Sequence, residues 1–148
     1  MKYLLIASAI TAADQLTKRW AERRFKDGDK AKKGKICLQN VRNSGAAMGI
    51  FADRPRLLTA LTVFSALQVC ASYYKLYKDG KLDDTYKFSA VCIFGGAAGN
   101  IIDRARRGYV TDFIQVGNSP VFNIADVFVS VGVIMFMTKR FFAEYIPR

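Results

Sequence analysis

The sequence predicts a membrane α-helical fold with four transmembrane helices, and three observations support this. Leu57–Tyr74 has 18 consecutive residues without a charge, and Phe88–Ile102 has 15. Two shorter uncharged runs, Tyr3–Ala13 and Val127–Thr138, have 11 and 12 residues and become longer if one polar residue is tolerated. A transmembrane helix needs about 18 predominantly apolar residues or more. The charges lie between the runs, and a chain of 148 residues is expected to form a single domain, 1–148.

The first helix is expected over about residues 3–18. The N-terminus, MKYLLIASAITAAD, has the positive charge and apolar run of a signal peptide, and cleavage is the alternative interpretation. The pattern continues through Asp14 to Leu16 and Trp20, which favours a retained helix with an aromatic anchor at the membrane interface. A long basic loop follows over about 19–56, and inside it Ile36–Phe51 indicates a strand and a turn.

The other elements alternate in the same way between apolar runs and polar connections. In order they are a helix over about 57–77, a turn over about 78–85, a helix over about 86–102, a loop over about 103–121 and a helix over about 123–142. Gly95 and Gly99 give the third helix a GxxxG spacing, which permits close helix packing in lipid. In the second loop, the alternation of Val110–Val116 predicts a strand.

The composition excludes several kinds of site. The chain has no histidine, so Ser-His-Asp and Cys-His catalysis and the commonest metal ligand are all absent. Cys37, Cys70 and Cys92 lack the spacing of a zinc site, and we expect neither a metal nor a cofactor. The net charge of +11 invites a nucleic-acid partner, but no binding motif accompanies it and we expect none. Acid–base chemistry must therefore rest on carboxylates, Lys, Tyr or Cys.

If the four helices cross the membrane in alternating directions, the carboxylates that interrupt or follow apolar runs lie at one membrane face. They are Asp14, Asp103, Asp126 and, in the second loop, Asp112. The segment Asn43–Gly49 lies at the same face and is made of small residues, so backbone can approach a ligand closely there. Asn43 and Gly45 suit the binding of an extended peptide through main-chain hydrogen bonds. The turn at 78–85 and the C-terminus share the opposite face.

Two of these carboxylates have contrasting surroundings. On a strand, Asp112 shares a face with Val110 and Ile114, and desolvation there would raise its pKa, unless that face points to solvent. Asp126 follows Asn123 by three positions, which fits a helix-capping arrangement and is consistent with a purely structural role. If Asp112 and Asp126 lie close together, one holds a proton while the other activates water, and the pair titrates as a unit.

The remaining polar residues are expected to support this pair. Asp14 and Lys18 stand at i and i+4 and are expected to form an ion pair. Asp103 and Arg104 are expected to form a charge pair that supports the loop. Asn100 lies one helical turn before them and is expected to point its amide inward.

Five stretches of this chain resemble the signal peptidase II family, the lipoprotein signal peptidases of bacteria. In order they are DQLTK (14–18), NSGAAMG (43–49), GGAAGNIIDR (95–104), VTDF (110–113) and FNIAD (122–126). They occur in the family's order and span nearly the whole chain, so the set is far more specific than any one motif. Met48 stands where the family usually has Phe, a change expected to alter substrate-facing packing and not the chemistry.

The resemblance implies an intramembrane aspartic endopeptidase that cleaves diacylglyceryl-modified prolipoproteins just before the lipidated cysteine. It maps the catalytic pair onto Asp112 and Asp126. It maps the supporting polar residues onto Asp14, Lys18, Asn43, Gly45, Asn100, Asp103, Arg104 and Asn123. The family fold is four transmembrane helices with a small extracytoplasmic β-cradle and a short interfacial helix. We expect a monomer in the bacterial cytoplasmic membrane, multi-pass, with membrane lipid and prolipoproteins as partners and the active site towards the extracytoplasmic face.

Charge alone favours the opposite orientation. The face that carries the carboxylates holds 15 of the 23 Lys and Arg, and positive loops usually face the cytoplasm. Two other functional classes compete with a peptidase. A transporter or proton pathway would also use intramembrane carboxylates, but it needs polar groups across the full membrane thickness. A soluble basic binding protein would leave membranes on washing with salt alone.

Overall fold

The computed structural model describes residues 1–26, 28–45 and 55–145, and Met48 lies outside them. Within the described residues there are four helices and one three-stranded sheet. The helices are α1 (Lys2–Arg24), α2 (Pro55–Lys78), α3 (Asp84–Arg107) and α4 (Ile124–Tyr145), and the strands are β1 (Lys30–Lys33), β2 (Ile36–Asn43) and β3 (Val110–Val116). The predicted order of helices, loops and turn is therefore confirmed.

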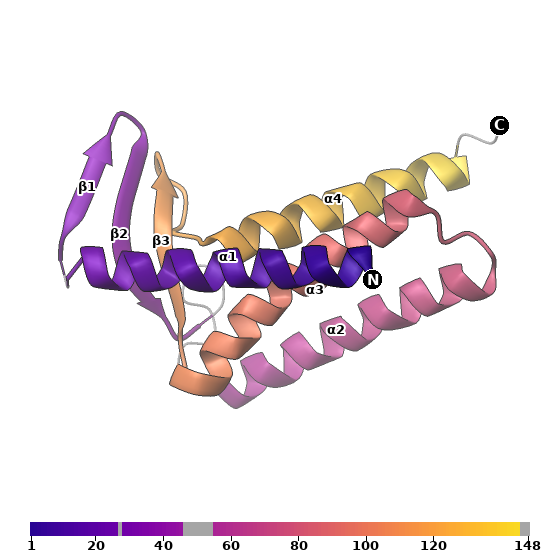
Figure 1. The fold of residues 1–148 in the computed structure, drawn as a ribbon, viewed down its shortest axis with the longest axis horizontal. Helices are drawn as coiled ribbons and strands as arrows, with labels where there is room; N and C mark the ends of the chain where they lie inside the picture. The colour runs from indigo at the N-terminus through magenta and orange to yellow at the C-terminus, as the bar shows by residue number, and fades with distance from the viewer. Residues whose placement is uncertain (27, 46–54, 146–148) are drawn as a thin grey trace.

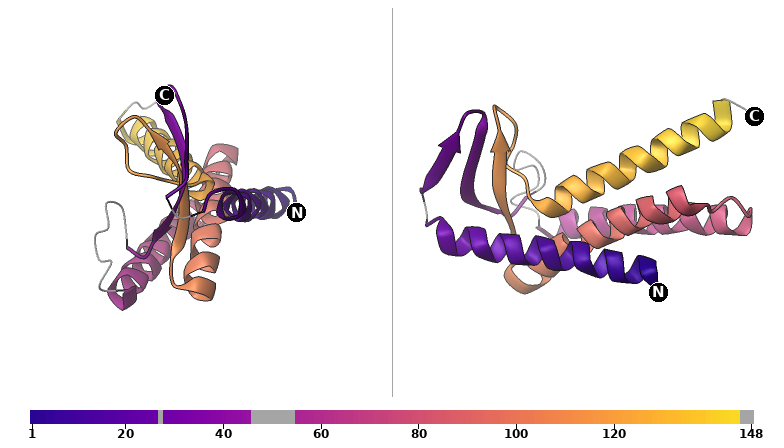
Figure 2. Two further views of the ribbon diagram at one scale, coloured as in Figure 1. Left: turned by 90° about the vertical axis from the view of Figure 1, so that its left-hand side faces the viewer. Right: turned by 45° about the horizontal axis from the view of Figure 1, so that its top comes forward.

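Helices α2, α3 and α4 lie to one side of the sheet, whereas the C-terminal part of α1 runs alongside the strands; α3 packs against both α1 and α4 (Figures 1 and 2). The N-terminus, the end of α4 and the connection from α2 to α3 lie at the end of the helices remote from the sheet (Figure 1), and residues 146–148 lie outside the described residues. Two contacts join the elements at that end. The Tyr3 hydroxyl donates to Asp84 Oδ1 (2.8 Å), and Lys139 Nζ pairs with Asp83 Oδ2 (2.7 Å). The predicted grouping of the turn with the C-terminus is confirmed.

The sheet is antiparallel in the order β1-β2-β3. Its register joins the loop that follows α1 to the loop that follows α3. Val41 pairs with Asp112 and Asn43 with Val110, so Asn43 lies beside the strand position of Asp112. The bounds of β3 match the prediction. Strand β1 was not predicted, because its four residues (KAKK) are all exposed and show no apolar alternation.

Two helices run further than their uncharged segments predict. Helix α1 continues to Arg24 instead of ending near residue 18, because Ala21 on its inner face is fully buried and packs with Phe25 and Phe113. Helix α3 continues to Arg107 and ends at Gly108, which has the left-handed φ of 77° that favours glycine. Both extensions are amphipathic, so a search for uncharged runs misses them.

The predicted close packing at Gly95 and Gly99 is confirmed. A Cβ at Gly95 would lie 3.0 Å from Ala7 O, and one at Gly99 would overlap the Asp14 carboxylate. Gly96 serves the opposite side of α3, where a Cβ would lie 2.6 Å from Ala125 O in α4. Helix α3 therefore approaches both neighbours at backbone distance, next to Asp14 and the start of α4.

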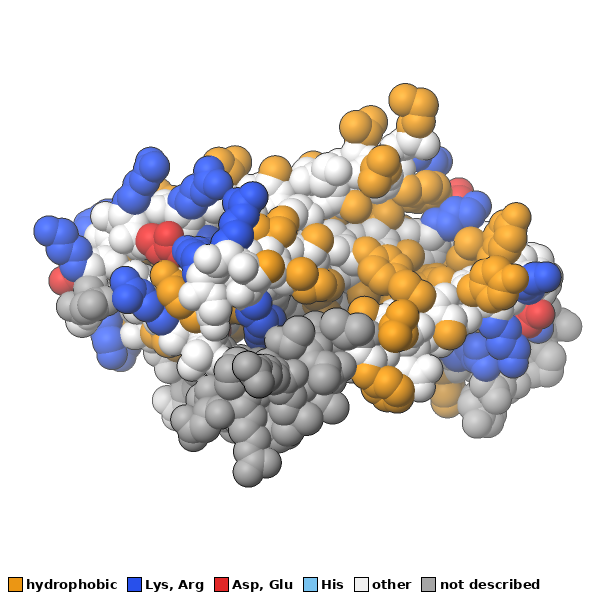
Figure 3. Space-filling model, turned by 90° about the horizontal axis from the view of Figure 1, so that it is seen from below, with side chains coloured by type: hydrophobic (Ala, Val, Ile, Leu, Met, Phe, Trp, Pro, Cys, Tyr) orange, Lys and Arg blue, Asp and Glu red, His pale blue; other side chains and the backbone are white. Residues whose placement is uncertain are grey.

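The outer surfaces of the helices carry many large apolar side chains. Leu4, Leu67 and Ile134 are 73%, 63% and 64% exposed. Figure 3 shows apolar side chains over the middle of one face of the molecule and Lys and Arg towards its two ends. No helix in the described part of the chain is both long enough and apolar enough to qualify as a membrane span. The shortest of the four described helices has 22 residues, so the expected short interfacial helix stays a prediction.

Gly96 gives a test of this packing. We expect Gly96→Ala to destabilise the protein by about 1–3 kcal/mol, because the added methyl group collides with the backbone of α4 at Ala125. Ala105→Leu, on the exposed end of the same helix, is the control and should change the free energy of unfolding by less than about 0.5 kcal/mol. Thermal unfolding followed by circular dichroism measures both, and equal stability of Gly96→Ala and wild type would refute the close approach.

Candidate active site

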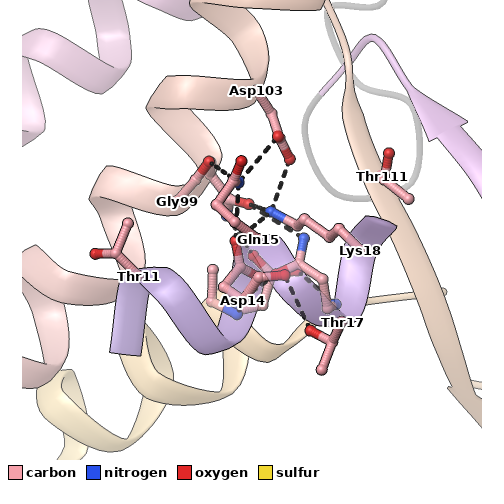
Figure 4. Close-up of polar contacts among 12 residues, drawn as sticks. Thr11, Asp14, Gln15, Thr17, Lys18, Gly99, Asp103 and Thr111 are labelled. Carbon is pink, nitrogen blue, oxygen red and sulfur yellow. Dashed lines mark hydrogen bonds and ion pairs between the residues drawn. The ribbon is translucent and has the colours of Figure 1, made fainter. Parts of the chain in front are cut away.

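Lys18 lies at the centre of a buried charge cluster between α1 and α3 (Figure 4). Its Nζ is 2.8 Å from Asp14 Oδ2 and 2.8 Å from Asp103 Oδ2, and none of the three side chains is more than 1% exposed. The predicted Asp14–Lys18 pair is confirmed. Buried charges are tolerated only when they are paired and hydrogen-bonded, so this cluster rigidly fixes α1 against α3.

The expected pair between Asp103 and Arg104 is wrong. Successive helical residues point in different directions, and Asp103 turns towards α1, where Gln15 Nε2 donates to its Oδ1 (3.0 Å). Arg107, one turn further along α3, supplies the second cation to Asp103. Arg104 points to the sheet side and makes a long hydrogen bond (3.4 Å) to the carbonyl of Gly45.

Asn100 connects the charge cluster to Asp126. Lys18 Nζ donates to Asn100 Oδ1 (2.8 Å), and Asn100 Nδ2 donates to Asp126 Oδ1 (2.8 Å). An ammonium group can only donate, so the amide oxygen of Asn100 must face Lys18 and its NH2 must face Asp126. Lys18 thereby directs the NH2 group of Asn100 towards the carboxylate of Asp126, without contacting Asp126 itself. The predicted inward position of Asn100 is confirmed.

Asn123 and Asn43 are oriented by the same principle. Asn123 Oδ1 accepts from the backbone N–H of Asp126 (3.0 Å), so its NH2 is left to donate to Asp112 Oδ1 (2.7 Å). Asn43 Oδ1 accepts from the N–H of Gly45 (3.0 Å), and its NH2 donates to Asp112 Oδ2 (2.8 Å). Each amide oxygen is held by a group that can only donate, and each NH2 therefore faces a carboxylate.

Asp126 occupies the first turn of α4 and takes part in its cap. Its Oδ2 accepts from the backbone N–H of Asn123 (3.1 Å), the reciprocal of the bond from its own N–H. Asp14 Oδ1 accepts from the N–H of Ala125 (2.9 Å) in the same turn. The capping arrangement predicted for Asn123 and Asp126 is confirmed. Backbone N–H groups and the positive end of the helix dipole favour negative charge at this position.

Asp112 lies in a different environment, although Asn123 contacts both residues. It is 3% exposed, and burial raises the pKa of its carboxyl group to about 6. The nearby charge of Asp126 adds to this rise, while the hydrogen bonds from Asn43 and Asn123 oppose it. The predicted rise in the pKa of Asp112 is thus confirmed. The strand does not have one buried and one exposed face at this point, because Thr111 and Phe113 on the other face of β3 are buried as well.

Residues that sequence reasoning missed fix the start of β3. Thr111 Oγ1 donates to Glu22 Oε1 (2.5 Å), and Arg107 pairs with both Glu22 and Asp103. The i to i+4 spacing of Asp103 and Arg107 is a signal that could have found one of these contacts. No local signal connects Glu22 in the first helix with Thr111. These contacts hold the strand that carries Asp112 against α1.

A cavity of about 500 Å³ opens beside Asp112. It is lined by the end of β2, the turn after it and the loop that precedes α4: Val41, Arg42, Asn43, Ser44, Gly45, Asp112, Asn118, Ser119, Pro120 and Val121. In the described ranges, no three Cys, Asp or Glu side chains are grouped so that they could hold a metal ion. The cavity, the two carboxylates and the amide donors form a site suited to acid–base chemistry on an extended chain.

The charges and amides of the site gather at one end of the helices. Asp14, Lys18, Asp103 and Asn123 are buried where α1, α3 and the start of α4 meet, and Asn123 contacts Asp112 in β3. A proton pathway would require such groups along the whole length of the bundle. This arrangement favours a site at one end of the helices over a pathway along their whole length.

The charge cluster makes a prediction about stability. We expect Lys18→Met to lower the free energy of unfolding by about 3–5 kcal/mol, because Asp14 and Asp103 stay buried after losing their shared cation. Lys87→Met, which removes the exposed Lys87–Asp84 pair, should lower it by less than about 1 kcal/mol. Denaturant unfolding followed by circular dichroism compares the two, and similar losses would show that the cluster is not a structural centre.

Comparisons with known proteins agree with this geometry. The sequence model of the family described as signal peptidase (SPase) II matches residues 6–142. The lipoprotein signal peptidase of Caldicellulosiruptor bescii is 38% identical, over 91% of this chain and 87% of that protein. The corresponding protein of Moorella thermoacetica is 36% identical, over 91% of this chain and 89% of its own length.

A solved structure of a bacterial membrane enzyme, determined by the in meso method at 2.3 Å resolution, has the same fold. It superposes with a TM-score of 0.84 at 29% identity and covers 99% of this chain and 92% of that one. The family match extends over most of the described helices and both strands that line the cavity. The chain therefore belongs to the signal peptidase II family of proteases.

Proposed function

We propose that this protein removes the signal peptide from diacylglyceryl-modified prolipoproteins by aspartic catalysis at Asp112 and Asp126. Membership of the family supports cleavage of lipoprotein signal peptides. The observation that carries the catalytic assignment is Asn123, whose amide donates to Asp112 and whose backbone N–H donates to Asp126. One residue thus contacts both carboxylates, and one of them, Asp112, lines a cavity of about 500 Å³.

The two surroundings divide the roles of the pair. Asp126 accepts hydrogen bonds from Asn100 and from a backbone N–H at a helix N-terminus, so its carboxylate is held in place to act as the general base. Asp112 is desolvated and has a raised pKa, which favours its protonated form. Asp126 takes a proton from water as the water attacks the scissile carbonyl, and Asp112 gives its proton to the carbonyl oxygen. The C–N bond then breaks as the proton held by Asp126 passes to the leaving amine, and one hydroxyl of the diol intermediate returns its proton to Asp112.

The substrate is expected to lie in the cavity between the end of β2 and the loop before α4. Asn43 and Gly45 border the cavity on one side and Ser119 borders it on the other. The peptide would pass Asp112 in an extended form, with the bond before the lipidated cysteine next to the dyad. Its diacylglyceryl group would remain in the lipid, alongside the apolar outer surfaces of the helices.

The exposed apolar surfaces support insertion of all four helices in the membrane. A large contiguous apolar surface marks contact with lipid or a partner, and here it covers the helices while Lys and Arg gather beyond it (Figure 3). In this arrangement the sheet and the dyad lie at one face of the bacterial cytoplasmic membrane, which we assign to the extracytoplasmic side. A monomer would suffice for this function, since one chain supplies the proposed dyad and its amide donors.

The catalytic assignment is tested by cleavage of a diacylglyceryl-modified precursor. We expect Asp112→Ala and Asp126→Ala each to lower kcat by at least about 10³-fold, because neither carboxylate can take over the role of the other. Asp29→Ala, at an exposed carboxylate in the turn before β1, is the matched control and should keep wild-type activity. Full activity in either dyad variant would remove that residue from the mechanism.

The pKa of Asp112 gives a second test. Asn43 donates to the Asp112 carboxylate and so lowers its pKa; Asn43→Ala should therefore raise the pKa above the value of about 6 in the wild type. The protonated carboxyl band in infrared difference spectra should persist to higher pH, and the alkaline limb of the activity profile should shift in the same direction. Asp112→Asn identifies the band by removing it.

Asn40→Ala is the control for this titration, because Asn40 lies in the same strand and donates to the Phe25 carbonyl instead of to Asp112. The carboxyl band of this variant should titrate as in the wild type. A pKa of Asp112 that falls in Asn43→Ala would contradict the proposed network.

A further inference from the structure

A second cavity lies at the opposite end of the helices from the dyad, between α2, the turn that follows it, α3 and α4. Its volume is about 220 Å³. Its floor is apolar and includes Leu76 and Tyr86, which are 4% and 3% exposed and belong to one buried cluster. Ala143 in the last turns of α4 adds a further apolar wall. The dyad and its hydrogen-bond partners take no part in this cavity.

The rim of this cavity is cationic. Lys75 in α2, Lys81 in the turn and Arg140 in α4 all line it, and Asp79 is the one carboxylate among its lining residues in the described part of the chain. Three positive groups from three separate elements therefore converge on one small space. Such a space suits an anion with several oxygen acceptors, and phosphate has the geometry that Lys and Arg bind best.

The nearby carboxylates are already paired with other cations. Asp83 binds Lys139 (2.7 Å), and Asp84 binds Lys87 (3.3 Å) and the Tyr3 hydroxyl (2.8 Å). The lysine partner also lowers the pKa of Asp83, so this carboxylate remains ionised and engaged. Asp83 and Asp84 therefore have partners of their own, and Asp79 alone among the described lining residues offsets the three cations, which leaves the lining with a net charge of +2 (three cations less one carboxylate).

Aromatic residues surround this end of the molecule. Tyr74 and Tyr77 on α2 are 61% and 68% exposed, and Phe142 on α4 is 52% exposed. Aromatic side chains concentrate at the depth of the lipid headgroups in membrane proteins. In the membrane placement proposed above, on which this step rests, the cavity opens at the headgroups of the cytoplasmic leaflet.

We propose that this cavity binds the phosphate group of an anionic phospholipid of the cytoplasmic leaflet. The phosphate would lie between Lys75, Lys81 and Arg140, and the glycerol and first methylene groups would rest on Leu76 and Ala143. Basic pockets between helices on the cytoplasmic side are a recurrent means of binding such headgroups. The lipid would bridge α2 to α4 at the end where the turn joins α2 to α3.

The test measures lipid binding to the full chain in a neutral detergent. Native mass spectrometry with phosphatidylglycerol and phosphatidylcholine should show a preference for the anionic lipid. Lys75→Gln/Lys81→Gln should weaken phosphatidylglycerol binding about 25-fold, since each basic residue near a headgroup contributes about fivefold in affinity. Lys2→Gln/Lys87→Gln removes the same charge at the same end but outside the cavity, and should change binding less than about twofold.

Four outcomes would overturn the proposal. Binding could show no preference for the anionic lipid, or both double variants could lose it equally, which would mean diffuse surface charge. Inorganic phosphate could displace the lipid completely at millimolar concentration, which would mean a site for free phosphate. Finally, Lys75→Gln/Lys81→Gln could bind phosphatidylglycerol with the same affinity as the wild type.

Two further measurements separate this proposal from the proposed function. Both double variants should still cleave the diacylglyceryl-modified precursor, because neither pair of residues touches the dyad. Extraction of the chain from membranes by salt alone would refute the membrane placement itself. Retention of the chain with no preference for anionic lipid would refute only the second site.

Discussion

The buried ammonium group of Lys18 is the interaction on which the rest of the structure depends. It neutralises Asp14 and Asp103, which allows α1 and α3 to approach at Gly95 and Gly99, and it fixes the direction of the Asn100 amide. Because the amide oxygen of Asn100 faces Lys18, its NH2 group faces Asp126. A single cation thus connects helix packing with the hydrogen bonding of the candidate site, and a neutral side chain of the same size could do neither.

Much of this arrangement could be predicted from the sequence. The uncharged runs predicted four helices, and the alternation of their directions brought Asp14, Asp103, Asp112 and Asp126 to one end, as the structure has them. The cap at Asn123 and the strand Val110–Val116 were also predicted with their bounds. These features depend on local spacing and on connectivity, which a single sequence contains.

Other features could not be predicted, because they depend on contacts between distant segments. The partners of Asp103 come from α1 and from a later turn of α3, so the neighbouring Arg104 was the wrong choice. The bond between Thr111 and Glu22 spans most of the chain and leaves no local pattern. The amphipathic extensions of α1 and α3 carry charges, which a search for uncharged runs reads as loop.

The hydrogen bond from Ala125 to Asp14 joins the last helix to the first. During synthesis, α1 is complete long before the ribosome has made α4. Until then the Asp14 carboxylate has no hydrogen bond from Ala125, and Asn100 has no hydrogen bond from Asn123. Asp112 has no second carboxylate, that of Asp126, nearby. If the proposed dyad is the catalytic pair, the nascent chain would hold only part of the site, and synthesis of α4 would be the step that completes it.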